Sequence, residues 1–328
     1  MRKIYMLTMS LFVCMGALAG NDGSIGKNLH WSFADGTLTI SGTGEMEHAE
    51  GNSVYAWGTD NQSLDRSKIK KIVVEEGVTT LGEYIFWDCE SLTEVKLPKS
   101  LTALRKECFK SCTALKSITL PDNISLIEES AFEECKALET VTFPKNLTEV
   151  HAQAFYTCNL KKVDLSQTQV ETIGSAAFAQ NAHCEEVYLP KTLKTLEGDS
   201  EGTFSSCGVK KAVCSAVEPP KTIDGGFDFF TLEKKTNRVY WVDIFQGSAE
   251  DFVLEVPAES VERYKNADGW KKAASHITTG IRGVKAAQAK VGVYDISGKR
   301  YMSHADAQAI STLQHGVYII NGKKVLVK

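Results

Sequence analysis

Hydrophobic and polar positions alternate in short segments that return at a fixed interval along the middle of the chain. Each segment has the form Leu-x-x-Val-x-Leu, as in "LTEVKL", "LKSITL" and "LETVTF". A phenylalanine precedes each one, and these residues recur 23 positions apart, with a three-residue insertion before the last: Phe86, Phe109, Phe132, Phe155, Phe178 and Phe204. Alternation with a period of two predicts a β-strand. A fixed interval in the twenties predicts a stack of repeated units.

The alternation also predicts where the side chains of each strand point. Successive side chains of a strand lie on opposite sides. In "LTEVKL", Val95 and Leu97 should therefore point into the stack, and Glu94 and Lys96 should point outward. Seven segments share this phase, from "IKKIVV" to the degraded "VKKAVC".

The other half of each unit has a different spacing. In "IEESAFEEC", Ile127, Ala131 and Cys135 are four residues apart, which predicts a short helical turn on the convex side. The sequence therefore predicts a leucine-rich repeat solenoid, with parallel β rungs and short helical turns. One unit alone has too little core to fold, so each unit must cover the apolar face of its neighbour.

A cysteine stands three residues after the phenylalanine in most units. The set is Cys89, Cys112, Cys135, Cys158 and Cys207, with Asn181 in the fifth unit. Neighbouring rungs lie about 4.8 Å apart, which is close enough for a disulfide. Side chains in register point the same way, however, and pairing would need two of them to turn toward each other. We predict that these cysteines are reduced and fill space in the core as small apolar residues.

The first residues differ from the rest of the chain. Arg2 and Lys3 precede an apolar run that ends in Ala17-Leu18-Ala19, which predicts a secretory signal peptide over residues 1–19. A lipoprotein anchored through Cys14 is the alternative, but the residues just before it are too bulky. No later stretch reaches the ~18 apolar residues of a membrane span. We expect an exported chain with no membrane span after cleavage.

The complete repeat motif and its flanks resemble a known family. The motif A-F-x-x-C-x-x-L-x-x-V-x-L-P resembles the BspA-like leucine-rich repeat proteins of Bacteroidota surfaces. "LHWSFADGTLTISGTGEM" is similar to the β-rich segment that opens such proteins, and "FVLEVPAESVERYKNADGWKKA" resembles their closing strand–helix unit. The domains predicted after the signal peptide are an N-terminal β cap (20–66), the repeats (67–214), a C-terminal cap (215–275) and a β module (276–328). Caps cover the open edges and apolar faces that the end rungs would otherwise expose.

The last fifty residues have another pattern. "VGVYDISGKR" and "GVYIINGKKVLVK" read as short strands, with a hairpin turn signal at Asn321-Gly322. These segments resemble the C-terminal sorting domain of type IX secretion cargo, which implies a secretion address. A small β module without that role is the alternative.

Composition and motifs give little indication of catalysis, metal binding or nucleic-acid binding. The formal net charge is −4, and no clustered basic excess indicates nucleic-acid binding. "GDSEG" (198–202) fits a hydrolase nucleophile motif, but no buried strand and helix flank it. The histidines and cysteines lack metal-site spacing, and His183 and Cys184 should face opposite sides of a strand. We therefore predict no catalytic residues, no cofactor and no metal.

Function is then expected on a surface. The resemblance implies adhesion or protein–protein contact with a host extracellular-matrix or bacterial surface macromolecule, by a protein that we expect to be a monomer. A structural component of a surface complex without a host ligand is the alternative. The outward residues of the rungs pair opposite charges at Lys71–Glu94 and Lys162–Glu186–Lys211. We predict a partner-binding site on the concave face, around Lys162, Asp164, Glu186, Tyr188 and Lys211, with Tyr188 exposed as its anchor.

Overall fold

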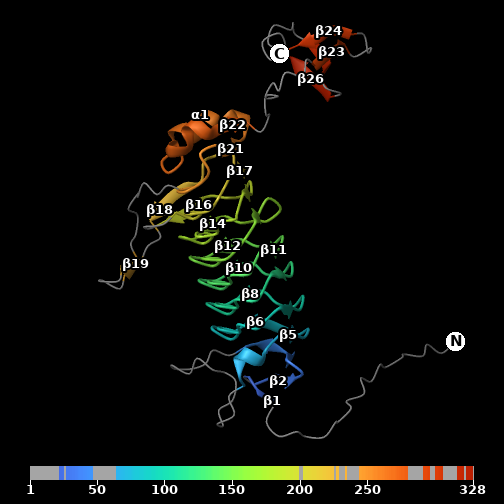
Figure 1. The fold of residues 1–328 in the computed structure, drawn as a ribbon, viewed down its shortest axis with the longest axis vertical. Coiled ribbons are helices and arrows are strands. Elements are labelled where there is room, and N and C mark those ends of the chain that lie inside the picture. Colours follow the sequence, from blue (N-terminus) through green and yellow to red (C-terminus); the bar gives the residue numbers. More distant parts are fainter. Residues whose placement is uncertain are drawn as a thin grey trace, which may run out of the picture.

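The protein is a stack of short parallel strands (Figure 1). The computed structural model describes residues 22–25, 27–46, 64–198, 202–224, 227–228, 233–234, 244–279, 291–295, 300–305, 316–320 and 323–327. Residues 1–21, which include the predicted signal peptide, lie outside this set. The predicted leucine-rich repeat solenoid is confirmed.

The Val-x-Leu segments form one side of the stack, here named the first face. Its strands are β5 (Lys71–Val74), β7 (Glu94–Lys96), β9 (Ser117–Thr119), β11 (Thr140–Thr142), β13 (Lys162–Asp164), β15 (Glu186–Leu189), β17 (Lys211–Cys214) and β21 (Val253–Val256). The predicted register holds, since Lys71 lies opposite Glu94, and Lys162 opposite Glu186. Val95 and Leu97 pack against the core, whereas Glu94 and Lys96 are exposed, as predicted.

A second series of strands runs along the other side of the stack, here named the second face. It is a continuous sheet of β4 (Gly44–Glu45), β6 (Val78–Leu81), β8 (Ala103–Leu104), β10 (Leu126–Ile127), β12 (Glu149–Val150), β14 (Thr172–Ile173), β16 (Thr195–Gly198) and β18 (Lys221–Asp224). The sequence analysis predicted strands on one side only, because these segments are only two to four residues long.

The segments that join the second face to the next rung differ from the predicted helical turns. The residues two before and two after the phenylalanine have positive φ, as at Ser130 (56°) and Glu134 (59°). Such left-handed residues interrupt the hydrogen-bond ladder of an α-helix. Ser130 N and Phe132 N donate instead to Ala152 O (3.0 Å) and Ala154 O (2.8 Å) of the next turn. These segments are therefore turns that hydrogen-bond to the next turn of the stack, and they contain no helix over residues 69–198.

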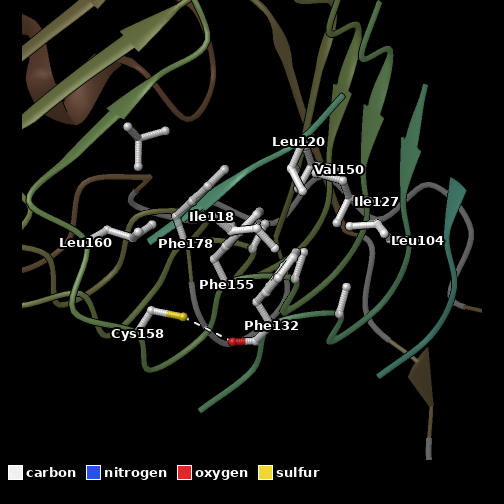
Figure 2. Close-up of a cluster of buried hydrophobic side chains, with 14 of the residues drawn as sticks. Leu104, Ile118, Leu120, Ile127, Phe132, Val150, Phe155, Cys158, Leu160 and Phe178 are labelled. Atoms are coloured by element: carbon white, nitrogen blue, oxygen red, sulfur yellow. Dashed lines mark hydrogen bonds between the residues drawn. The ribbon is translucent and has the colours of Figure 1, made fainter. Parts of the chain in front are cut away.

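Between the two faces, the phenylalanines form a single stacked column (Figure 2). Ring centroids of Phe109, Phe132, Phe155 and Phe178 lie 5.1–5.3 Å apart, and consecutive rings are within 7° of parallel. All four rings are completely buried. Offset stacking at this distance adds stabilisation to that of the buried apolar area. The column ties each turn to both of its neighbours.

The cysteines lie beside this column and are hydrogen-bonded. Each thiol donates to the phenylalanine carbonyl of the preceding turn: Cys112 to Phe86 (3.2 Å), Cys135 to Phe109, Cys158 to Phe132 and Cys207 to Phe178 (3.1 Å each). Figure 2 shows the bond from Cys158. All cysteines in the described residues are buried and free, so the prediction of space-filling thiols is confirmed. Burial raises the pKa of the Cys207 thiol to about 12, which keeps it protonated and poorly reactive.

Asn181 takes the cysteine position in the fifth unit and compensates for a local deletion. Leu138 follows Cys135 by three residues and donates its N–H to the Cys135 carbonyl, but Leu160 follows Cys158 by only two. Leu160 N donates to Asn181 Oδ1 instead (2.9 Å), while Asn181 Nδ2 donates to Phe155 O (2.9 Å). A cysteine would supply the second bond but would be a poor acceptor for the first.

The N-terminal strands continue both faces below the first repeat. The antiparallel strands β1 (Asp22–Ser24), β2 (Leu29–Ala34) and β3 (Thr37–Gly42) join the first face, since β3 pairs in parallel with β5. The short 3₁₀ helix η1 (Arg66–Lys68) leads into β5. Leu38 and Ile40 are completely buried beneath the first rung.

At the other end, residues 244–256 form an additional turn of the stack, within the segment that the sequence analysis assigned to the C-terminal cap. Phe245 stacks on Phe204 at 5.6 Å, Phe204 N donates to Ile244 O (3.0 Å), and Gly247 takes the left-handed position with φ 82°. Strand β21 then pairs in parallel with β17. The column and the first face therefore both extend one turn beyond the recognised repeats.

A short helical cap closes this end. It consists of the 3₁₀ helix η2 (Ala258–Ser260), helix α1 (Val261–Asn266), the 3₁₀ helix η3 (Lys271–His276) and strand β22 (Ile277–Thr279). Trp270 is completely buried, and its Nε1 donates to Pro220 O (2.8 Å). Tyr264 packs edge-on against Trp270 and donates to Ala216 O (2.8 Å). The cap thus covers the last apolar layer.

The remaining strands belong to two small sheets. Strands β19 (Phe227–Asp228) and β20 (Glu233–Lys234) pair with each other. Four antiparallel strands form the C-terminal sheet, in the order β24 (Arg300–Ala305), β23 (Val291–Asp295), β25 (Gly316–Ile320) and β26 (Lys323–Val327). The predicted domain boundaries stay predictions. Within the described residues, no helix is long and apolar enough to cross a membrane.

Candidate binding surface

Three adjacent strands of the first face bring the five predicted site residues together. Lys162, Glu186 and Lys211 lie side by side on β13, β15 and β17, and Asp164 lies opposite Tyr188. All five occupy outward positions of their strands. The grouping follows directly from the parallel register of the repeats.

Tyr188 lies at the centre of this group. Its hydroxyl donates to Glu186 Oε2 (3.2 Å). The Nζ atoms of Lys162 and Lys211 lie 4.4 Å and 5.9 Å from the centroid of its ring. An ammonium group this close to an aromatic face is attracted to it. The ring is half-buried by these neighbours, so the expectation of a fully exposed tyrosine is wrong.

The ion pairs of the group differ from those predicted. Lys162 Nζ contacts Asp164 Oδ2 at 2.9 Å on its own strand, and Lys211 Nζ contacts Glu255 Oε1 at 3.2 Å on β21. Residues two apart on a strand point to the same side, so each lysine can choose between neighbours along and across the sheet. The predicted pair Lys71–Glu94 is confirmed at 2.8 Å.

Glu255 is the member of the group that sequence reasoning missed. It continues the outward column of Asp164, Tyr188 and Val213 on β21, yet it is only 8% exposed. Strand β21 follows β17 after a long insertion, outside the repeat phase. The alternation in "FVLEV", with Phe252 and Leu254 buried, is the signal that could have placed it.

A hollow of about 350 Å³ adjoins the group, where β17 and β21 end. Its wall is mainly apolar. It is lined by Val213, Cys214, Ser215, Glu255, Val256, Pro257 and Ala258. Val213 lies directly opposite Tyr188. The hollow is therefore continuous with the outward side of the tyrosine group.

Hydrogen bonds and burial set the charge state of the group. Burial alone would raise the pKa of Asp164, but hydrogen bonds from Ser166 and Lys162 outweigh it and lower that pKa. The hydrogen bond to Asp164 raises the pKa of Lys162. Burial and the nearby Glu186 raise the pKa of Tyr188, which keeps it protonated. The group contains three acidic side chains, Asp164, Glu186 and Glu255, and two lysines, Lys162 and Lys211.

The middle of the first face has a different surface. Its outward residues are the uncharged Ser117, Thr119, Thr140 and Thr142, all exposed on β9 and β11. Neither an aromatic ring nor a charged group occupies these outward positions of β9 and β11. The tyrosine group is thus confined to the C-terminal half of the first face.

The side chains considered for catalysis are not assembled into a reactive site in the described residues. His183 is exposed and Cys184 is buried, on opposite sides of the chain. Burial also raises the pKa of Cys184 far above its ordinary value. Residues 199–201 of the "GDSEG" motif lie outside the described residues. Among the residues that can be described, no group of three or more His, Cys, Asp or Glu could hold a metal ion.

Comparison with known proteins identifies the repeats. Residues 59–165 and 102–218 match the BspA type leucine-rich repeat region, in six copies. The match covers the first face from β5 to β17 and ends before the C-terminal sheet. No curated protein is similar enough to this chain to count as a relative.

Three solved structures illustrate the similar proteins. A leucine-rich repeat protein of T. pallidum is 24% identical, over 56% of this chain and 83% of its own, with a TM-score of 0.41. A leucine-rich cell surface protein of Faecalibacterium prausnitzii is 15% identical, over 77% and 93%, with a TM-score of 0.34. A leucine-rich repeat protein of Bacteroides ovatus is 16% identical, over 77% and 80%, with a TM-score of 0.30.

Proposed function

Because residues 59–218 match the BspA type leucine-rich repeat region, we propose that this protein binds another protein through the C-terminal half of its first face. A solenoid presents an extended surface whose outward residues can vary without disturbing the core. The observation that supports this location is Tyr188, an aromatic ring placed between two ammonium groups on a largely polar face. Tyrosine and charged neighbours of this kind are common anchors of interfaces.

The proposed role is adhesion or contact at the outside of a bacterial cell. The basic and apolar pattern of residues 1–19 supports export. The C-terminal sheet of β23 to β26 supports a separate address module, in keeping with its resemblance to sorting domains. The proposed partner is an extracellular-matrix protein of a host or a surface macromolecule of a neighbouring bacterium. We propose no catalytic activity.

The test is a binding assay with a matched pair of variants. Full-length protein would be immobilised and titrated with purified extracellular-matrix proteins and, separately, with surface fractions of neighbouring bacteria. Tyr188→Ala should weaken binding of the responsive partner by about fivefold or more. Thr142→Ala, an outward residue of the same face, should leave binding unchanged.

Thermal unfolding of both variants provides the folding control. Neither residue belongs to the buried core, so the melting temperatures should stay close to that of the parent protein. If both variants bind like the parent protein, the interface lies elsewhere. If no matrix or bacterial macromolecule binds saturably, the adhesive role is wrong and the alternative of a structural component gains support.

A further inference from the structure

The hollow beside Tyr188 has a composition that selects its occupant. It combines an apolar wall of Val213, Val256, Pro257 and Ala258 with Glu255, whose carboxylate contacts Lys211. We infer that this hollow receives a lysine or arginine side chain of the protein partner. This inference rests on the proposed function, because it names the partner residue that would dock beside Tyr188.

The apolar wall suits the stem of such a side chain. Val256 is buried, Val213 and Pro257 are half-buried, and Ala258 is exposed at the rim. Lysine and arginine bury their methylene chains along apolar surfaces while the charged end finds a polar partner. The hollow of about 350 Å³ has room for a stem of this length.

The charge balance favours a cationic end. The group contains Asp164, Glu186 and Glu255 against Lys162 and Lys211, so it carries one excess negative charge. Lys162 is paired with Asp164 and Lys211 with Glu255. For Glu186, which lies directly across from Lys211, the contact described is the Tyr188 hydroxyl. One additional cation would make the group neutral.

An exchange of partners makes room for that cation. The Lys211 side chain is 28% exposed, whereas the Glu255 side chain is 10% exposed, so the lysine can move and the carboxylate is confined. When a partner ammonium or guanidinium meets Glu255, Lys211 can turn to Glu186 on the neighbouring strand. Every carboxylate then has a cation, and the partially desolvated Glu255 keeps a charge-assisted hydrogen bond.

Other side chains fit the hollow less well. An acidic side chain would meet the buried Glu255 and add a repulsion, which is a strong source of discrimination. A purely apolar side chain would fill the hollow but leave the excess charge in place. The structure therefore favours cationic over both acidic and apolar partner residues.

Small probes can test this preference without knowledge of the partner. N-acetyl-lysine methylamide would be titrated into the full-length protein, with the methyl resonances of Val213 and Val256 as the readout. N-acetyl-norleucine methylamide has a similar stem without the charge, and N-acetyl-glutamate methylamide has the opposite charge. The lysine probe should bind saturably in the millimolar range expected for its size, at least about fivefold more tightly than either control.

Three variants test the assignment to Glu255. Glu255→Gln should weaken binding of the lysine probe by about fivefold or more, because the carboxylate that meets the cation is removed. Lys211→Met should strengthen binding of the lysine probe, because the competing ammonium group is removed. Ala258→Phe fills the hollow from its exposed rim and should abolish binding without altering the core. Glu149→Gln, on the second face, is the matched control and should change nothing.

The outcomes separate this inference from the proposed function. Equal binding of the lysine and norleucine probes, an unchanged affinity in Glu255→Gln, or no saturable shift would each overturn the cation site. The proposed interface would still stand if Tyr188→Ala weakened the macromolecular partner. Conversely, a lysine probe that binds as expected while Tyr188→Ala has no effect would retain the site and reject the proposed interface.

Discussion

The interior of the stack and its first face belong to the same repeated turns, yet only the interior repeats. Inside, Phe109, Phe132, Phe155 and Phe178 stack at nearly constant spacing. Outside, the same rungs carry serine, threonine, lysine, glutamate or tyrosine at equivalent positions. An interior side chain must match the turns above and below it, whereas an outward side chain mainly contacts water and its strand neighbours. Specific function is therefore expected outside, and sensitivity to substitution inside.

The largest expected effect comes from breaking the interior column. Phe132→Ala removes a completely buried ring that stacks on Phe109 and Phe155. We expect it to destabilise the protein by about 3–5 kcal/mol, measured by urea unfolding of the full chain. Thr142→Ala, on the first face, should change stability by less than about 0.5 kcal/mol. Similar losses for the two variants would contradict the distinction between interior and face.

A smaller effect is expected at Asn181, where the interior departs from the repeat. Asn181→Leu removes the acceptor for Leu160 N and the donor to Phe155 O, and should cost about 1–3 kcal/mol. Asn181→Cys restores the donor found in the other units, and should lose less. Amide hydrogen exchange at Leu160 should accelerate in both variants, because both lack its acceptor. A cysteine variant as stable as the parent, with unchanged exchange, would show that the deletion needs no compensation.

The smallest effect is expected on the first face, at the Lys71–Glu94 pair. The hydrogen bond that Lys71 donates to the Glu94 carboxylate lowers the pKa of Glu94 below the ordinary 4.5. A carboxyl group whose pKa is lower in the folded state stabilises the protein at pH values above its unfolded-state pKa. This stabilisation is lost as the pH falls through the folded-state pKa. Glu94→Gln should therefore produce a slight loss in the melting temperature at neutral pH and low salt. The loss should vanish in high salt and in acid; a large loss that persists in both would mean that the face is part of the core.

Much of the stack could be predicted because each turn repeats its neighbour. The period placed the column phenylalanines from Phe86 to Phe204 and the cysteines that follow them, and the register placed Lys71 against Glu94. The convex turns were harder, because residues four apart are buried together in a helix and also in these turns. The left-handed residues at Ser130 and Glu134 are neither glycine nor asparagine, so the sequence offered no signal for them.

The candidate site was predictable only in part. Its five residues were grouped correctly, since parallel strands in register bring their outward positions together. Which lysine pairs with which carboxylate was not predictable, because flexible side chains choose among several partners at similar distances. Glu255 and the hollow required the additional turn around Phe245, where an insertion hides the period.

The sequence by itself determined the repeated turn, its register and the residues that fill its interior. It could do so because a short unit translated along one axis has the same neighbours at every step. Only the tertiary structure decided how the stack ends. It also decided that Asn181 accepts a hydrogen bond from the turn that is one residue shorter, and that Lys211 pairs with Glu255 beside an apolar hollow. These features depend on contacts between segments that are far apart in the chain and out of phase with the repeat, so no local pattern encodes them.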